Sequence, residues 1–128
     1  MFSLRSSLSE QSHNAARALF AEIDGARSVV VATADGFELA QAGPGHGDAS
    51  RLAAMVSSFA ALGDAASRES NIGTPRCLVI ESTDGRLLVR CMQVRGQSLV
   101  VVVLADKKVL LGLVWHQLAL AEKLMNAE

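Results

Sequence analysis

The chain has no tyrosine, one tryptophan, four phenylalanines and only two cysteines. Cys77 and Cys91 are too few for the disulfide framework of a small secreted protein. The N-terminal stretch from Met1 to Leu8 contains no apolar run of the length that a signal peptide needs. We therefore expect reduced thiols and a cytoplasmic protein.

Net charge and long apolar runs are also scarce. The formal net charge is −1, so bulk charge favours binding neither to nucleic acid nor to acidic lipid. The most apolar region, residues 99–115, is interrupted by Asp106, Lys107 and Lys108, whereas a bilayer span needs about 20 largely uncharged residues. This region predicts a buried strand followed by a helix, and no membrane insertion.

The chain does have enough apolar sequence for a core. Half of its 128 residues are hydrophobic and a fifth are charged, which is a globular composition rather than a disordered one. A domain of this length buries roughly two-thirds of its unfolded surface. We expect one domain over residues 1–128, with a core spanning about residues 8–126.

The first part of the chain predicts a helix followed by a hairpin. Apolar residues at helical spacing predict a helix over residues 8–24, and Gly25 can end it. Residues 28–33 are rich in β-branched side chains, and residues 37–40 alternate. Asp35-Gly36 between them supplies the positive φ of a tight turn, so we expect two paired strands.

A long middle helix should begin at Asp48, whose carboxylate can cap its first turn. One apolar stripe has three- and four-residue spacing; it comprises Leu52, Met55, Val56, Phe59, Leu62 and Ala66. Nearly all the remaining positions are small, namely Ala53, Ala54, Ser57, Ser58, Ala60, Ala61 and Ala65. We expect this small-residue face to make close contact with another element or molecule.

Three further strands, residues 77–82, 86–94 and 98–105, should precede a final helix that presents Leu111, Val114, Leu118 and Met125 on one face. The order helix, two strands, helix, three strands, helix predicts an α/β protein of α+β sandwich type, with helices flanking a five-stranded antiparallel sheet. Residues 29–31 and 99–104 suit central strands because they are apolar without alternation. Residues 37–40 and 77–82 should therefore form the edges. The second edge has few charges to protect it, and we expect it to favour a homodimer.

The candidate chemical motifs are weak. The loop Gly43-Pro44-Gly45-His46-Gly47 lacks the Gly-Lys-Ser/Thr of a phosphate loop, and we interpret it as a connector. His13, His46 and His116 are scattered, so we expect no metal site. A two-residue loop at Asp84-Gly85 would place Cys91 opposite Leu78, whereas a three-residue loop would pair Cys77 with Cys91. The first register groups the apolar side chains better, and it favours two separate buried thiols.

The sequence contains no nucleophile turn and no carboxylate pair with an acid or base partner, so we expect neither a catalytic residue nor a cofactor. Arg51, Ser58 and Arg68, on or at the ends of the middle helix, are candidates for partner contacts.

Several short segments, spread in order along the chain from about Ala15 to Leu124, carry a resemblance to a known family. They are residues 23–26 leading into 29–40 (IDGA and VVVATADGFELA), residues 52–55 (LAAM), residues 79–81 followed by Asp84-Gly85, and residues 110–113 (LLGL). In their order and spacing these segments resemble the roadblock/LC7 family, to which the bacterial MglB proteins belong.

This resemblance implies a profilin- or longin-like sheet between helices, and a dimer in which third strands and middle helices meet. The dimer interface would then include Met55, Phe59, Leu62, Leu78 and Ile80. The family implies a non-catalytic platform that binds a small Ras-like GTPase, in a GTPase-activating or scaffold role.

A small-molecule sensor domain of PAS or GAF type is the alternative, because such domains also combine a two-strand and a three-strand block. They usually have several helices between the blocks and a pocket with aromatic and polar groups. This chain has one expected connecting helix and no tyrosine, which favours the GTPase platform. An enzyme is a third class, and no residue pattern supports it.

Overall fold

The computed structural model describes residues 7–44 and 48–127. Its elements follow the expected order of helix, two strands, helix, three strands and helix. They are α1 (Leu8–Glu22), β1 (Ala26–Thr33), β2 (Glu38–Ala42), α2 (Ala49–Glu69), β3 (Cys77–Glu81), β4 (Arg86–Val94), β5 (Gln97–Ala105) and α3 (Leu111–Ala127). The predicted α+β architecture is therefore confirmed.

The strands form one antiparallel sheet in the order β2-β1-β5-β4-β3. The apolar runs of β1 and β5 lie side by side at its centre, where they are buried on both faces. The two predicted edges, β2 and β3, are the observed ones.

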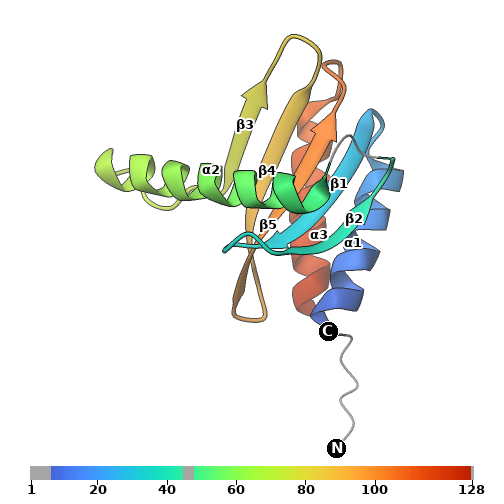
Figure 1. Cartoon of the computed structure of the whole chain (residues 1–128), viewed down its shortest axis with the longest axis horizontal. Coiled ribbons are helices and arrows are strands. Elements are labelled where there is room, and N and C mark those ends of the chain that lie inside the picture. Colours follow the sequence, from blue (N-terminus) through green and yellow to red (C-terminus); the bar gives the residue numbers. More distant parts are fainter. Residues whose placement is uncertain (1–6, 45–47, 128) are drawn as a thin grey trace, which may run out of the picture.

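Helices cover both faces of this sheet. Figure 1 shows α1 and α3 side by side behind it, with α2 crossing in front of the strands. The larger core lies between the sheet and the α1–α3 layer, and includes Leu19, Leu88, Val101 and Leu118. None of the helices in the described part of the chain combines the length and apolarity that a bilayer crossing requires.

A half-buried ion pair fixes the end of α3 to the sheet. Arg90 on β4 contacts Glu122 on α3 at 2.8 Å, and both side chains are mostly shielded from solvent. The second carboxylate oxygen of Glu122 accepts a hydrogen bond from the backbone N–H of Gln93. Because both oxygens of Glu122 have partners, the charge is well satisfied at this site.

The three glycines at the hairpin turns act differently. Gly36 takes the predicted positive φ, +99°. Arg95 and Gly96 both have positive φ in a two-residue turn between Val94 and Gln97, a conformation that costs arginine more than glycine. Gly85 has no positive φ, but a Cβ there would lie 2.9 Å from the carbonyl oxygen of Ala105. Glycine is needed at this position for close approach of the two backbones, not for turn conformation.

The β3–β4 register differs from both predicted registers. Cys77 pairs with Arg90, and the loop spans four residues, 82–85, closed by a hydrogen bond from Ser82 N–H to the Gly85 carbonyl. The shift from the two-residue loop is two residues, so the side chains keep the predicted faces. The thiols do remain separate, but the expectation that both are buried is wrong, because Cys77 is exposed.

The buried face of α2 also differs from the predicted stripe. Ala53 and Val56 are its buried residues, and Ala60 packs beside them against the sheet. Met55 and Leu62, which belong to the predicted stripe, are instead exposed. Small side chains let the helix lie close to the sheet, so part of the small-residue face is the inner face and two large side chains turn outward.

Candidate functional site

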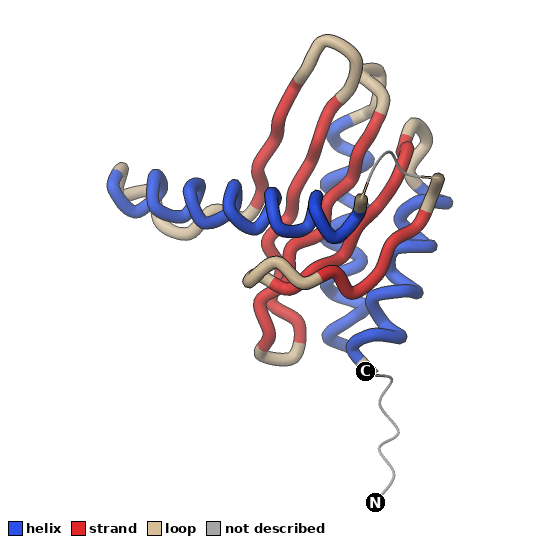
Figure 2. Tube along the Cα trace, viewed as in Figure 1, coloured by secondary structure: helices blue, strands red, loops and turns tan. Residues whose placement is uncertain are grey.

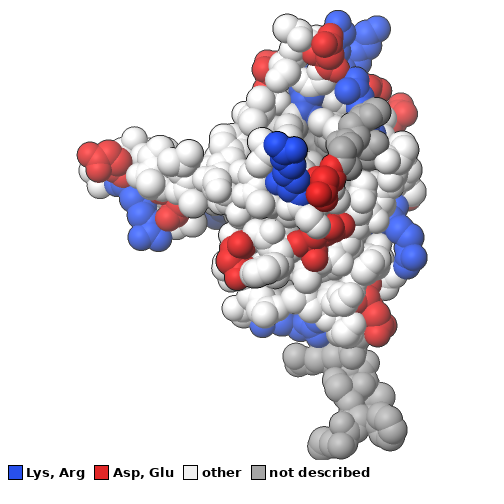
Figure 3. Space-filling model, in the orientation of Figure 1, with Lys and Arg blue, Asp and Glu red and all other residues white. Residues whose placement is uncertain are grey.

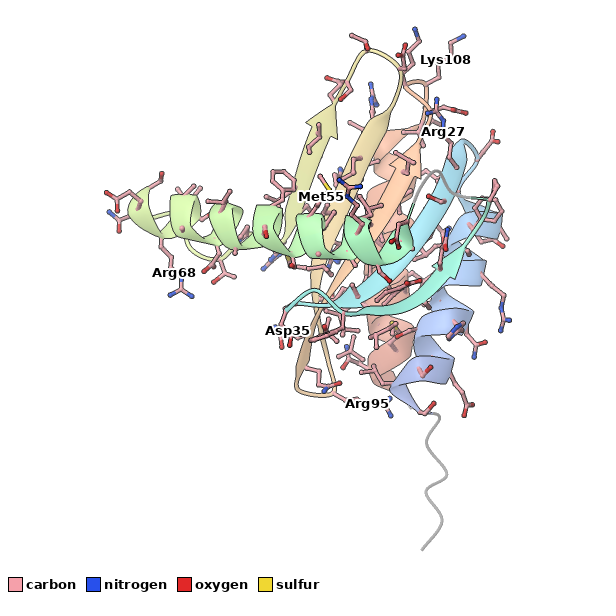
Figure 4. All side chains as sticks on the ribbon, viewed as in Figure 1. Arg27, Asp35, Met55, Arg68, Arg95 and Lys108 are labelled. Carbon is pink, nitrogen blue, oxygen red and sulfur yellow. The ribbon has the colours of Figure 1, made fainter. Side chains whose placement is uncertain are left out.

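The main candidate site is an apolar surface formed by one flank of α2 and the strand β3. We call it the α2–β3 surface, and it contains Met55, Phe59, Leu62, Leu78 and Ile80. Met55 is 63% exposed, Leu62 is 70% exposed and Ile80 is 43% exposed. Figure 4 shows Met55 on the flank of α2 that faces the upper part of the sheet. Contiguous exposed apolar side chains of this kind mark interaction sites.

Phe59 and Leu78 connect this surface to the interior. Both are half-buried and pack against the smaller core beneath α2. Helix α2 lies tightly against β3 at Gly63, where a Cβ would lie 2.5 Å from a methyl carbon of Leu78. Figure 2 shows that the last turns of α2 continue beyond β3, past the edge of the sheet. Phe59 and Leu78 thus anchor the surface to the core, while Met55, Leu62 and Ile80 remain exposed to solvent.

The outer edge of β3 offers a row of unpaired backbone groups. In the ladder with β4, Cys91 N–H donates to the carbonyl of Arg76 and Ser82 N–H donates to the carbonyl of Gly85. Because the backbone hydrogen-bonding direction alternates from residue to residue along an antiparallel strand, the N–H and C=O groups of Leu78 and Ile80 point toward β4. The N–H and C=O groups of Cys77, Val79 and Glu81 therefore point out of the sheet, where another strand can pair with them.

The three predicted partner-contact residues occupy different places. Arg51 and Ser58 lie on the exposed outer side of α2. Arg68 lies at the end of α2 and forms an ion pair with Asp64 one turn earlier, at 3.0 Å. An exposed pair of this type contributes little stability, so Arg68 remains available to a partner. The structure does not bring the three residues together into one cluster.

The described residues contain no group of three or more side chains arranged to hold a metal ion. Burial raises the pKa of the Cys91 thiol above its ordinary value, and the nearby Cys77 and Asp64 raise it further. A thiol with a raised pKa is a poor nucleophile at neutral pH. Residues 45–47 of the predicted connector, which include His46, lie outside the described residues.

A separate groove of about 270 Å³ lies between α1 and α3. Apolar and amide side chains line it, including Gln11, Ala15, Ala18 and Leu124. It has no titratable lining residue, so it offers neither an acid nor a base for chemistry.

Sequence reasoning missed two exposed apolar residues near α2 and β3. Val79 lies at the middle of the β3 edge and is 43% exposed. Phe37, in the β1–β2 turn, is 68% exposed. The only sequence signal for Phe37 is an aromatic residue directly after Asp35-Gly36, where turn chemistry places it at the surface.

Comparison with known proteins gives a consistent result. The Roadblock/LC7 domain family matches residues 14–105 of this chain. No protein with a curated description matches the sequence. Among solved structures, Myxococcus xanthus MglB has a TM-score of 0.82 at 17% sequence identity, covering 98% of this chain and 92% of that chain. The gliding protein MglB of Thermus thermophilus has a TM-score of 0.80 at 20% identity, covering 96% of this chain and 91% of that chain.

The fold extends to a more distant group. Profilin IB of Acanthamoeba castellanii has a TM-score of 0.59 at 10% identity, covering 90% of this chain and 94% of that chain. At these identities the solved structures show likeness of fold alone. They confirm the profilin-like architecture expected from the sequence.

Proposed function

Because the chain belongs to the Roadblock/LC7 family, we propose that it is a homodimeric, non-catalytic platform that binds a small Ras-like GTPase and regulates its nucleotide cycle. The observation that carries this proposal is the α2–β3 surface, an apolar flank beside an open strand edge. The absence of a metal cluster among the described residues is compatible with a regulator and is not itself an argument for one.

The outward-pointing backbone groups of β3 support pairing between the β3 edges of two copies. All five residues of β3 can pair with β3 of the second copy only when the two-fold axis passes through Val79, the middle residue of the strand. In that register Cys77 lies opposite Glu81 of the second copy, and Leu78 lies opposite Ile80 of the second copy. A register centred on Glu81 places two carboxylates opposite each other, which is destabilising.

The same register brings the two α2 helices together. Each helix crosses its own β3 near Leu78, because Gly63 contacts that residue. The two Leu78 positions are then two residues apart along the paired strands, or about 7 Å. Helices pack at about 8–10 Å, so the two α2 helices lie side by side. The flanks that meet carry Met55, Phe59 and Leu62.

This arrangement leaves the outer side of both α2 helices free on one face of a continuous sheet. Arg51 and Ser58 lie on that side. Figure 3, which looks onto this face, shows it as mostly uncharged, with a few acidic and basic groups. An interface core of low charge with a polar rim is typical of protein partners. We assign this side of α2 to the GTPase.

The proposed function predicts binding that depends on the nucleotide. Purified protein should bind a small Ras-like GTPase from the same cell, and should bind its GTP-analogue and GDP forms with different affinities, because the two forms differ in their switch loops. Calorimetry with each loaded form measures the affinities, and single-turnover GTP hydrolysis with and without the protein measures the regulatory effect. Failure to bind any Ras-like GTPase of that cell, in either form, rules the proposal out.

A further inference from the structure

Phe37 is an exposed aromatic residue in a turn that several hydrogen bonds hold in place. Its N–H donates to the Thr33 hydroxyl at 3.0 Å, and its carbonyl accepts from the Thr33 N–H at 2.9 Å. The Gly36 N–H also donates to the Thr33 carbonyl, at 3.0 Å. On the other side, the Ala34 N–H donates to the Ser98 carbonyl of β5 at 2.9 Å. The backbone that carries Phe37 is therefore fixed at both ends.

The turn is also packed against the middle of α2. A Cβ on Gly36 would lie 3.0 Å from the Ser57 hydroxyl oxygen and 3.4 Å from the Ala54 Cα. Only glycine fits there, because φ is +99° as well. Figure 1 shows this turn alongside α2, on the side away from the upper part of the sheet. Phe37 thus borders the flank of α2 opposite to Met55.

Carboxylates surround this flank. Asp35 lies at the tip of the turn and is exposed (Figure 4). Glu38 accepts a hydrogen bond from the Ser50 hydroxyl at 3.0 Å, which places it beside the first turn of α2. Asp48 caps that same turn through the Ser50 N–H at 2.9 Å. Acidic groups are visible along the lower flank of α2 in Figure 3. A partner that docks here needs basic groups at the rim of its contact.

We infer that Phe37 is the aromatic anchor of the GTPase contact, and that it inserts into an apolar pocket on the GTPase edged by lysine or arginine side chains. This inference rests on the proposed function. Interface energy concentrates in a few central aromatic or arginine side chains that fill pockets. A side chain on a backbone already fixed loses little freedom on binding, which favours affinity.

The proposed Phe37 contact and the proposed dimer interface lie on different flanks of α2. The proposed dimer uses the Met55 flank of α2, while the β1–β2 turn lies against the Ala54 and Ser57 flank. Both turns in the dimer then face the same side of the sheet as the outer surface of α2. The aromatic anchor, the acidic rim and the candidate Arg51 and Ser58 contacts therefore all lie on the α2 side of the sheet.

The test is Phe37→Ser, with Leu110→Ser as the matched control. Both side chains are large, apolar and about 70% exposed, and Leu110 lies beside the opposite layer of the sheet. Phe37→Ser should weaken GTPase binding by about thirtyfold in calorimetry, with unchanged dimer mass and melting temperature. Leu110→Ser should leave the affinity unchanged.

A charge variant tests the second half of the inference. Asp35→Lys should slow association with the GTPase several-fold at low salt, and the difference should disappear at high salt. If the unaltered protein binds and Phe37→Ser binds equally well, the anchor is overturned while the proposed function stands. If Asp35→Lys associates at the same rate at low salt, the acidic rim is overturned. Failure of the unaltered protein to bind overturns the proposed function itself.

Discussion

Leu62→Asp is expected to convert the protein from a dimer into a folded monomer. Leu62 is 70% exposed in the single chain, so a carboxylate there remains hydrated and costs the protomer little. In the proposed dimer the same carboxylate would be buried between two α2 helices without a partner, which is strongly unfavourable. We expect the dissociation constant of the dimer to rise by a hundredfold or more, about 2.7 kcal/mol. Light scattering should then give the 13.5 kDa mass of one chain.

The control for this change is Leu124→Asp. Leu124 is 61% exposed on α3, on the opposite layer of the sheet, so this variant should keep the dimer mass. Phe59→Asp is less informative, because Phe59 is half-buried against the core beneath α2 and its loss affects folding as well as assembly. A Leu62→Asp protein that stays dimeric at low concentration contradicts the assignment of this flank of α2.

Leu118→Ala should lower the free energy of unfolding by about 3 kcal/mol, within the range seen when a buried leucine is truncated. Leu118 lies on the inner face of α3, has no exposed surface, and belongs to the larger core. Its removal leaves a cavity where α3 packs on the sheet, because close-packed neighbours fill it only in part. Urea unfolding followed by circular dichroism, at one fixed protein concentration, measures the change.

Leu120→Ala on the same helix is the matched control. Leu120 is exposed on the outer side of α3, so its truncation should change stability by less than about 1 kcal/mol. Equal losses at the two positions would show that the face of α3 that packs on the sheet is wrongly assigned.

The helices, the strands and the two sheet edges could be predicted because the apolar pattern of the sequence determines which strands are buried. Apolar runs without alternation in β1 and β5 require burial on both faces, and this alone places these strands at the centre. The order of elements then leaves β2 and β3 at the edges. The match to residues 14–105 confirms the family that the short segments indicated.

The β3–β4 register could not be predicted, because an Asp-Gly pair does not fix loop length. Gly85 was assigned to the turn conformation, whereas its role is close approach to the Ala105 carbonyl. That contact joins a loop residue to the last residue of β5, far away in the sequence, and has no local signature. The two-residue shift kept the faces correct only because the side-chain period of a strand is two.

The candidate site was predicted in part. Periodicity placed Met55 and Leu62 on a continuous apolar stripe, and their exposure became visible only when Ala53 and Ala60 were found beneath the helix. A stripe of this width serves two surfaces, one against the sheet and one open to a partner. The role proposed for Phe37 depends on packing of Gly36 against Ser57, a long-range contact that sequence spacing does not encode.

The central claim is that the β3 edges of two copies pair around Val79 to build the platform. Val79→Cys tests it most directly, in a chain that also carries Cys77→Ser and Cys91→Ala. In the proposed register the two Val79 Cα atoms are about 5.5 Å apart, within the range that a disulfide spans. Mild oxidation should therefore link the two copies, whereas Gln41→Cys on the other edge strand, in the same background, should stay unlinked. A Val79→Cys chain that stays unlinked, or that links no faster than the Gln41→Cys chain, contradicts the account.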